Sequence, residues 1–167
     1  FRSWYVWADP KDDGSPPNNW QSHFGGPSWE FDIRRGQYYL HNFLKEQPDL
    51  NLYDPAVRKA LLDSARFWLD MGVDGLRLDA VTCYFHSPDF KDNPVHPNPA
   101  PSNFNIDFPT PFSMQRHVND HLIPEALAFS EEIRQLLDSY DDRMAVGEIG
   151  GEEGIALAAK FTDGPKR

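Results

Sequence analysis

The chain has 167 residues, of which 40% are hydrophobic and 14% aromatic, so it can form a sizeable core and is too apolar for general disorder. Its formal net charge of −10 excludes nucleic acid as a natural partner, because phosphate binding needs clustered Lys and Arg. The single cysteine excludes an internal disulfide framework and favours a reducing, cytoplasmic location. The sequence contains no run of 18 apolar residues, so it predicts no membrane span. The chain lacks an initiator Met, and both ends resemble cuts, so we expect a fragment of a longer protein.

The first 50 residues form a segment rich in turn-forming residues. Pro, Gly and Asn recur in DPKDDGSPPNNW (9–20) and HFGGPSWEFD (23–32), and this composition argues against long helices. Aromatic residues are nevertheless too frequent here for a linker. The segment predicts a small, loop-rich subdomain or a binding wall.

Residues 54–71 are predicted to form an amphipathic helix. Asp54 can cap its N-terminus, Pro55 suits the first helical position, and Gly72 can terminate it. An apolar face is expected from spacings of three and four residues. Its members are Val57, Leu61, Ala65 and Trp68.

A buried parallel strand is predicted over residues 73–81, in the sequence GVDGLRLDAV (72–81). Arg77 and Asp79 are unusual there because charges seldom occur in a strand that is covered on both faces. Residues two apart on a strand point to the same face, so Arg77 can pair with Asp79 and keep it ionised.

The remaining residues predict a second helix and strand after a long loop. Residues 82–111 form a loop rich in Pro and Asn, at the strand end where parallel α/β proteins place their active sites. A helix is expected over 112–140, most clearly from Pro124, with an inner face of Ala126, Phe129, Ile133, Leu136 and Tyr140. A second buried strand is expected in 143–150, ending at Glu148, and another helix over 152–161.

Two carboxylates therefore stand near the ends of successive strands. Parallel neighbours lie about 4.8 Å apart, which places groups at matching heights within about 6 Å. Retaining glycoside hydrolysis needs two carboxyl groups about 5–5.5 Å apart. The Arg77 partner favours Asp79 as the charged nucleophile, and an acid without such help, Glu148, suits the acid/base role. A single acid at a strand end is more often a helix cap or a solvated group, so this pattern alone leaves both readings open.

The same residues carry a resemblance to glycoside hydrolase family 13, the α-amylase family. GLRLDAV (75–81) resembles its nucleophile segment, and AVGEIG (145–150) resembles the segment of its acid/base Glu. QPDLN (47–51) resembles a signature of the oligo-1,6-glucosidase and α-glucosidase branch. Further similarity to that branch and its bacterial α-glucosidases lies in PPNNW (16–20), FGGPSWEFD (24–32), QYYLHNF (37–43), NPVHPNP (93–99) and PFSMQRHVND (111–120).

The resemblance implies an α/β fold: a partial (β/α)₈ TIM barrel with about strands 4 and 5 and their helices. Residues 1–50 would belong to the end of the loop-rich insertion subdomain and 51–167 to the barrel. The third acid and the Asp and His of earlier strands would lie outside this segment. A barrel needs about 250 residues, so we expect this fragment to be inactive alone.

The resemblance also assigns the site residues. It implies Asp79 as nucleophile, Glu148 as acid/base and Arg77 as the nucleophile's partner. Ala80, where many 1,6-cleaving relatives have Val, leaves room that favours α-1,4 linkages. Phe24 and Phe43 would present aromatic walls to glucose, although both could equally fill the subdomain core.

The expected activity is retaining hydrolysis of a small oligosaccharide or α-glucoside, with no cofactor, no metal ligand set among the histidines, and no nucleic-acid or membrane partner. Two alternatives stay open. One is a transglucosylase, or a relative that forms or isomerises sucrose- or trehalose-type sugars. The other is a non-catalytic barrel relative with a binding or transporter-associated role, against which the presence of Asp79, Arg77 and Glu148 argues.

Overall fold

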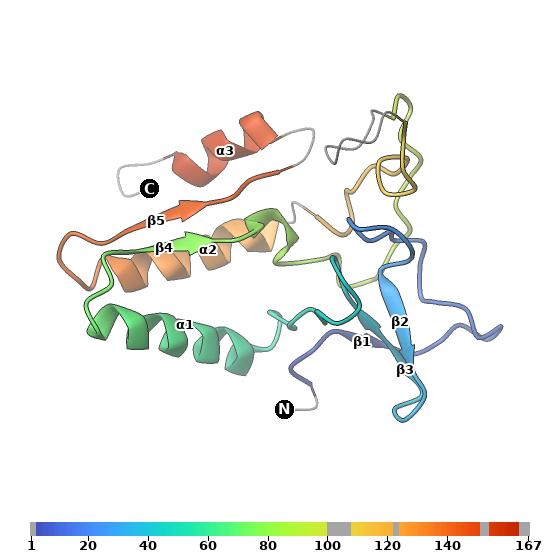
Figure 1. Ribbon diagram of the computed structural model, residues 1–167, viewed down its shortest axis with the longest axis horizontal. Coiled ribbons are helices and arrows are strands. Elements are labelled where there is room, and N and C mark those ends of the chain that lie inside the picture. Colours follow the sequence, from blue (N-terminus) through green and yellow to red (C-terminus); the bar gives the residue numbers. More distant parts are fainter. Residues whose placement is uncertain (1–2, 100–107, 122–123, 151–153, 164–167) are drawn as a thin grey trace. The chain divides into compact units, whose positions relative to one another are not determined.

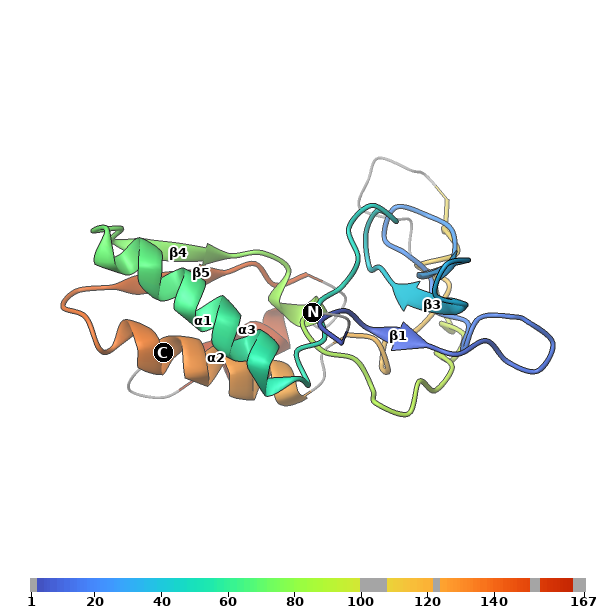
Figure 2. The same ribbon diagram turned by 90° about the horizontal axis from the view of Figure 1, so that it is seen from below.

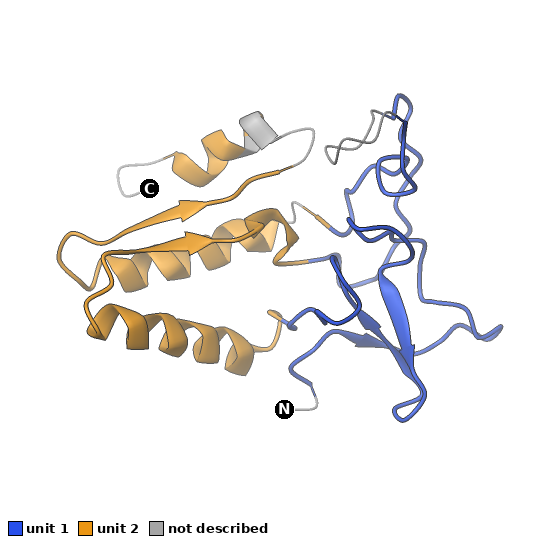
Figure 3. Cartoon of the chain, in the orientation of Figure 1, with its two compact units in different colours: residues 1–51, 86–120 blue, residues 52–85, 121–167 orange. Residues whose placement is uncertain are grey.

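The computed structural model describes residues 3–99, 108–121, 124–150 and 154–163. The chain divides into two compact units (Figure 3): Phe1–Asn51 with His86–Asp120 form unit 1, and Leu52–Phe85 with His121–Arg167 form unit 2. The first break, between Asn51 and Leu52, lies near the expected boundary at residue 50, and residues 86–120 group with the first segment.

A small antiparallel sheet organises unit 1 (Figure 1). Its strands are β1 (Trp7–Ala8), β2 (Trp29–Asp32) and β3 (Gln37–Leu40), in the order β1-β3-β2. Trp29 pairs with Leu40 and Phe31 with Tyr38. The aromatic-rich segment thus contains short strands, which its content of turn-forming residues did not predict. Its core consists of Val6, Ala8, Trp20, Trp29 and Leu40.

Side-chain amides fasten the Pro/Asn loop to the first segment within unit 1. Asn19 donates through Nδ2 to the carbonyl of Asn93 (2.9 Å) and accepts from its backbone N–H (2.8 Å). The indole of Trp20, which is fully buried, donates to the Lys91 carbonyl at 2.8 Å. Side-chain amides thus take the place of backbone ladders in the described part of the loop near Lys91 and Asn93.

The helix expected from residue 112 is wrong before Pro124 among the described residues. Residues 108–121 form turns and an isolated antiparallel bridge between Val95 and Gln115. The Arg116 N–H donates to the Pro94 carbonyl and the His96 N–H to the Met114 carbonyl. Backbone groups that bond across to another segment cannot form i to i−4 helical bonds.

Unit 2 begins with α1 (Pro55–Asp70), which confirms the first predicted helix. The Asp54 carboxylate accepts from the Ala56 N–H at 2.9 Å, and Gly72 follows the helix with φ +96°. The expected inner face is wrong at Trp68, which is 50% exposed, whereas Leu69 is buried. Among the described residues of unit 2, α2 is the helix that packs on α1. It covers one side of α1, and Trp68 lies on a different side and stays half exposed.

Two parallel strands follow, β4 (Gly75–Leu78) and β5 (Met144–Gly147), with Leu78 opposite Gly147 (Figures 1 and 2). Both are shorter than the predicted strands, and the expectation that they are buried on both faces is wrong. Met144 and Val146 are 63% and 58% exposed. The cause is that helices cover one sheet face, while the face of Arg77 and Val146 carries no layer among the described residues.

The covered face packs against α2 (Pro124–Leu137), and α3 (Gly154–Thr162) packs on α2. Leu78 and Ala145 line a common space with Ile133 of α2 and Phe161 of α3. The predicted inner face of α2 is confirmed except at Tyr140, which lies beyond the helix end and donates its hydroxyl to Asp70. Buried side chains of α2 are Ala126, Phe129, Ile133, Leu136 and Leu137.

Candidate active site

The backbone of the parallel pair places two carboxylates side by side. Leu78 lies opposite Gly147, so the next residues, Asp79 and Glu148, leave the two strands together. The pairing continues past the strand ends, because the Glu148 N–H donates to the Leu78 carbonyl at 2.9 Å. The Val81 N–H then donates to the Glu148 carbonyl at 3.1 Å, which fixes the backbone on both sides of the site.

One guanidinium joins both carboxylates. Arg77 donates through Nη1 to Oδ1 of Asp79 and through Nη2 to Oε2 of Glu148, the latter at 2.9 Å. The sequence interpretation gave Arg77 to Asp79 alone, and the structure corrects this point. The register explains the difference: Arg77 pairs with Val146, two residues before Glu148, so it lies on the same face of the sheet as both acids.

The electrostatics of the pair favour an ionised Asp79. The hydrogen bond from Arg77 is the main cause that lowers the pKa of Asp79, and a hydrogen bond with Glu148 adds to it. The same Asp79 hydrogen bond raises the pKa of Arg77. The three side chains are 60%, 71% and 54% exposed for Arg77, Asp79 and Glu148, so a solute can reach them from the open face of the sheet.

Ala80 makes the turn after Asp79. Its φ of +42° lies in the left-handed region, which a side chain with a Cβ rarely adopts. In this conformation the Ala80 N–H points to Oε2 of Glu148 at 3.4 Å, and the chain enters the short helix η1 (Val81–Cys83). The backbone around the site therefore also orients the second carboxylate.

Tyr84 is a neighbour of the site that the sequence analysis missed. Burial raises the pKa of the Tyr84 phenol to about 12, and the negative charge of Asp79 adds to the shift. Its ring packs edge-on against Phe129 of α2 with centroids 6.0 Å apart. Tyr84 follows Asp79 by only five residues, so the sequence hinted that it lies near the site. Its position there depends on the tight turn of η1, which the sequence analysis did not predict.

The two aromatic candidates lie together in unit 1. Phe24 is 54% exposed, and its ring centroid lies 5.7 Å from that of Phe43. The imidazole of His23 stacks on Phe43 at 5.0 Å with an angle of 10° between the planes. Phe24 is thus too exposed to belong to the core of the subdomain, which was one of the two interpretations of this residue.

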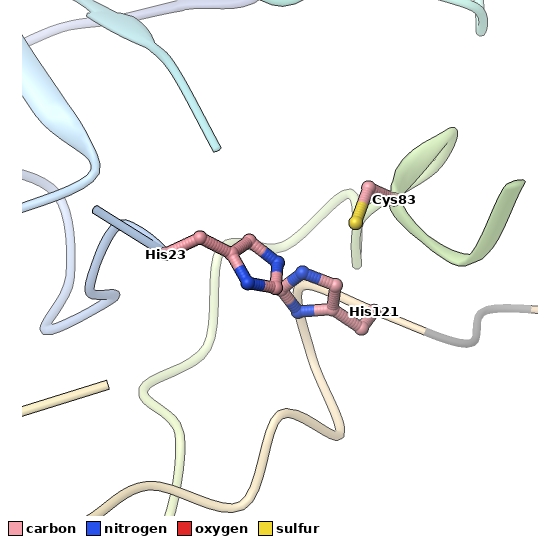
Figure 4. A group of neighbouring side chains, drawn as sticks. All are labelled: His23, Cys83 and His121. Carbon is pink, nitrogen blue, oxygen red and sulfur yellow. The ribbon is translucent and has the colours of Figure 1, made fainter. Parts of the chain in front are cut away.

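Two groups of side chains among the described residues have the atom types that could hold a metal ion. Figure 4 labels Cys83 and His121, which belong to unit 2, and His23, which belongs to unit 1, so these three residues do not form a metal site within one unit. In unit 1, His117 already contacts oxygen acceptors at both ring nitrogens: Oδ2 of Asp120 at 2.8 Å and the Phe112 carbonyl at 2.9 Å. This leaves neither nitrogen lone pair directed at an open position.

Comparison with known proteins gives the family. Residues 1–165 match the model of the α-amylase catalytic domain. The chain belongs to the α-amylase catalytic-domain family. It is 47% identical over 162 residues to a probable α-glucosidase of Rhizobium meliloti, covering 96% of this chain and 29% of that protein. It is 42% identical over 168 residues to an oligo-1,6-glucosidase of Heyndrickxia coagulans, covering 100% of this chain and 27% of that protein.

Solved structures of this α-amylase family extend the comparison. The α-glucosyl transfer enzyme XgtA superimposes with a TM-score of 0.91 at 48% identity, over 97% of this chain and 30% of XgtA. A trehalulose synthase superimposes with a TM-score of 0.74 at 36% identity, over 97% of this chain and 26% of the synthase. The chain thus spans less than a third of the relatives that it matches. No helix among the described residues combines the length and hydrophobicity that crossing a bilayer requires.

Proposed function

We propose that the whole protein is a retaining α-glucosidase in which Asp79 is the nucleophile and Glu148 the acid/base. The observation that carries this proposal is the pair of carboxylates that leave neighbouring parallel strands together and share Arg77. Asp79 would attack the anomeric carbon while Glu148 protonates the leaving oxygen, and Glu148 would then deprotonate the attacking water. This chemistry needs no cofactor, and the single cysteine supports a cytoplasmic location.

The same proposal includes a (β/α)₈ barrel to which unit 2 contributes about the fourth and fifth strands. Its support is the parallel pair β4 and β5, each followed by a helix, and the match to the catalytic-domain family. Residues 1–50 would then belong to the insertion subdomain, with Phe24 and Phe43 as aromatic surfaces that pack on the C–H faces of glucose. The remaining acid of the site would come from outside this chain.

Ala80 supports a preference for α-1,4 over α-1,6 linkages. Its methyl group leaves more room beside the nucleophile than a Val would, and its left-handed backbone makes the turn after Asp79 and directs its N–H to Glu148. The ratio of kcat/KM for maltose to that for isomaltose measures this preference.

Transfer of glucose to a sugar acceptor is the second candidate function. It is supported by the similarity to XgtA, an α-glucosyl transfer enzyme, and to a trehalulose synthase. The same carboxylates would serve it, with a sugar hydroxyl in place of water. The share of transfer products formed from maltose or sucrose separates the two functions.

The stereochemistry of the first product tests the mechanism in the whole protein that carries this chain. With a maltose-type substrate, proton NMR should show the α-anomer of glucose first, before mutarotation. Asp79→Asn should reduce kcat by at least about 10³-fold, since the nucleophile is lost. The exposed Glu46→Gln is the matched control and should keep full activity.

A first-formed β-anomer would overturn the retaining mechanism. Near-normal turnover by Asp79→Asn would overturn the role of Asp79 itself and would favour a different nucleophile, whereas no turnover by the unmodified whole protein would favour the non-catalytic relative.

A further inference from the structure

Five rings of unit 1 contact one another in a row, through two stacked and two tilted contacts. We call this row the ring column: Phe24, Phe43, His23, Phe112 and His117. Unit 1 consists of residues 1–51 and 86–120, and His23 of the first segment contacts Phe112 of the second, with ring centroids 4.1 Å apart. At one end His23 stacks on Phe43, and Phe43 contacts the exposed Phe24. At the other end Phe112 stacks on His117 with centroids 3.7 Å apart and planes at 21°. The column therefore joins residues about 90 positions apart in the sequence.

Polar contacts hold the His117 end of the ring column. Nδ1 of His117 lies 2.8 Å from Oδ2 of Asp120, and Nε2 lies 2.9 Å from the Phe112 carbonyl. Asp120 is buried, with 1% of its surface exposed. A buried carboxylate needs a strong partner, so His117 and Asp120 constrain each other and, through the carbonyl, the backbone of Phe112.

The segment that carries this pair is itself fastened to unit 1. The Asn119 N–H donates to Oδ1 of Asn93 at 3.1 Å, and Asn93 exchanges hydrogen bonds with Asn19. Gln115 donates through Nε2 to the Asn19 carbonyl at 2.7 Å. These bonds fix the loop on both sides of His117, so the ring of Phe112 is presented to His23 from a braced backbone.

We propose that His117 is a positioning residue: the His117–Asp120 pair holds Phe112 against His23 and thereby sets the orientation of Phe43. Phe43 is in contact with a half-exposed ring at one side and with His23 at the other, so its orientation depends on what supports His23. The inference rests on the proposed function in one respect, namely that Phe43 contacts the sugar. Displacement of the column would then weaken substrate binding more than the chemical step.

The test uses the whole protein with 4-fluorophenylalanine at position 43 and compares variants by ¹⁹F NMR and by kinetics on a maltose-type substrate. His117→Leu removes the ring and both polar contacts. His117→Leu with Asp120→Ala removes both polar partners together, which avoids a buried carboxylate without its histidine and protects the fold. Asp120→Asn keeps an acceptor oxygen for His117, and His96→Leu changes a histidine of the same loop outside the column.

The double variant should fold, shift or broaden the ¹⁹F signal of position 43, and raise KM about tenfold while kcat changes less than about threefold. Asp120→Asn and His96→Leu should leave the signal and KM near those of the unmodified protein. An unchanged ¹⁹F signal in a folded double variant would overturn the positioning role.

A changed signal with unchanged KM would also overturn it, provided that Phe43→Ala raises KM. If Phe43→Ala itself leaves KM unchanged, the proposed sugar contact of Phe43 fails, and the ¹⁹F comparison still decides whether His117 sets the orientation of that ring. The two failures are therefore distinguishable.

Discussion

Arg77 is the residue on which the two acids depend most directly. It donates to Asp79 and to Glu148 from β4, two residues before Asp79 and opposite Val146, and its hydrogen bond lowers the pKa of Asp79. Because all three side chains are exposed, the arrangement contributes through orientation and charge rather than through buried ion pairing. A nucleophile that stays charged over a wide pH range is what displacement at an anomeric carbon requires.

Replacement of Arg77 should change the pH dependence of kcat/KM in the whole protein. Arg77 lowers the pKa of Asp79, so the loss of Arg77 raises that pKa, and the proposed nucleophile becomes protonated at a higher pH. In Arg77→Met the acidic limb of the kcat/KM profile should move to higher pH, with activity at the optimum reduced by about 10²-fold or more. An acidic limb that does not move would show that Arg77 does not control the ionisation of Asp79. Arg143→Met provides the control, because Arg143 directly precedes β5 in unit 2 and pairs with Asp74 instead of the two acids.

The elements of unit 2 follow closely from their sequences. The start of α1 is defined by Asp54 and Pro55, and the turn that ends it needs Gly72 with its positive φ. The capping bond from the Ala56 N–H to Asp54 satisfies one of the backbone donors that every helix start leaves unpaired.

Asp54→Ala should therefore lower the free energy of unfolding by about 1 kcal/mol, measured by denaturation of the whole protein. Asp63→Ala is the matched control, since Asp63 lies within α1 and makes an exposed i, i+4 pair with Lys59, which is worth about 0.3–0.5 kcal/mol. Equal losses in both variants would show that the cap adds nothing beyond ordinary surface electrostatics.

Local patterns predicted the helices α1 and α2 and both parallel strands, because spacing, caps and β-branched or apolar runs act within a few residues. They failed where distant segments decide the structure. The segment 112–121 carries no helix because its backbone bonds to Pro94 and to the neighbourhood of His96, and Trp68 stays half exposed because α2 covers a different side of α1. The sequence predicted that Asp79 and Glu148 stand at the ends of neighbouring strands, whereas the second contact of Arg77 required the register of β4 and β5.

At the scale of the molecule, the two-stranded parallel sheet carries the site on a face that has no covering layer among the described residues. Met144 and Val146 lie on this face and are more than half exposed, which is costly for large apolar side chains. The chain spans less than a third of its relatives, and we expect the remaining strands of the proposed barrel to bury these residues in the whole protein. The ends of β4 and β5, which carry Asp79 and Glu148, would then form part of the wall of the active site.

The central claim is that Glu148 and Asp79 form one catalytic pair, and kinetics of Glu148→Gln in the whole protein test it most directly. The variant should fold normally and hydrolyse maltose-type substrates at least about 10³-fold more slowly, because their leaving group needs a proton. An aryl α-glucoside with an acidic phenol as leaving group should lose much less in the glucosylation step. Turnover of maltose near that of the unmodified protein would contradict the assignment of Glu148 and, with it, the account of the site.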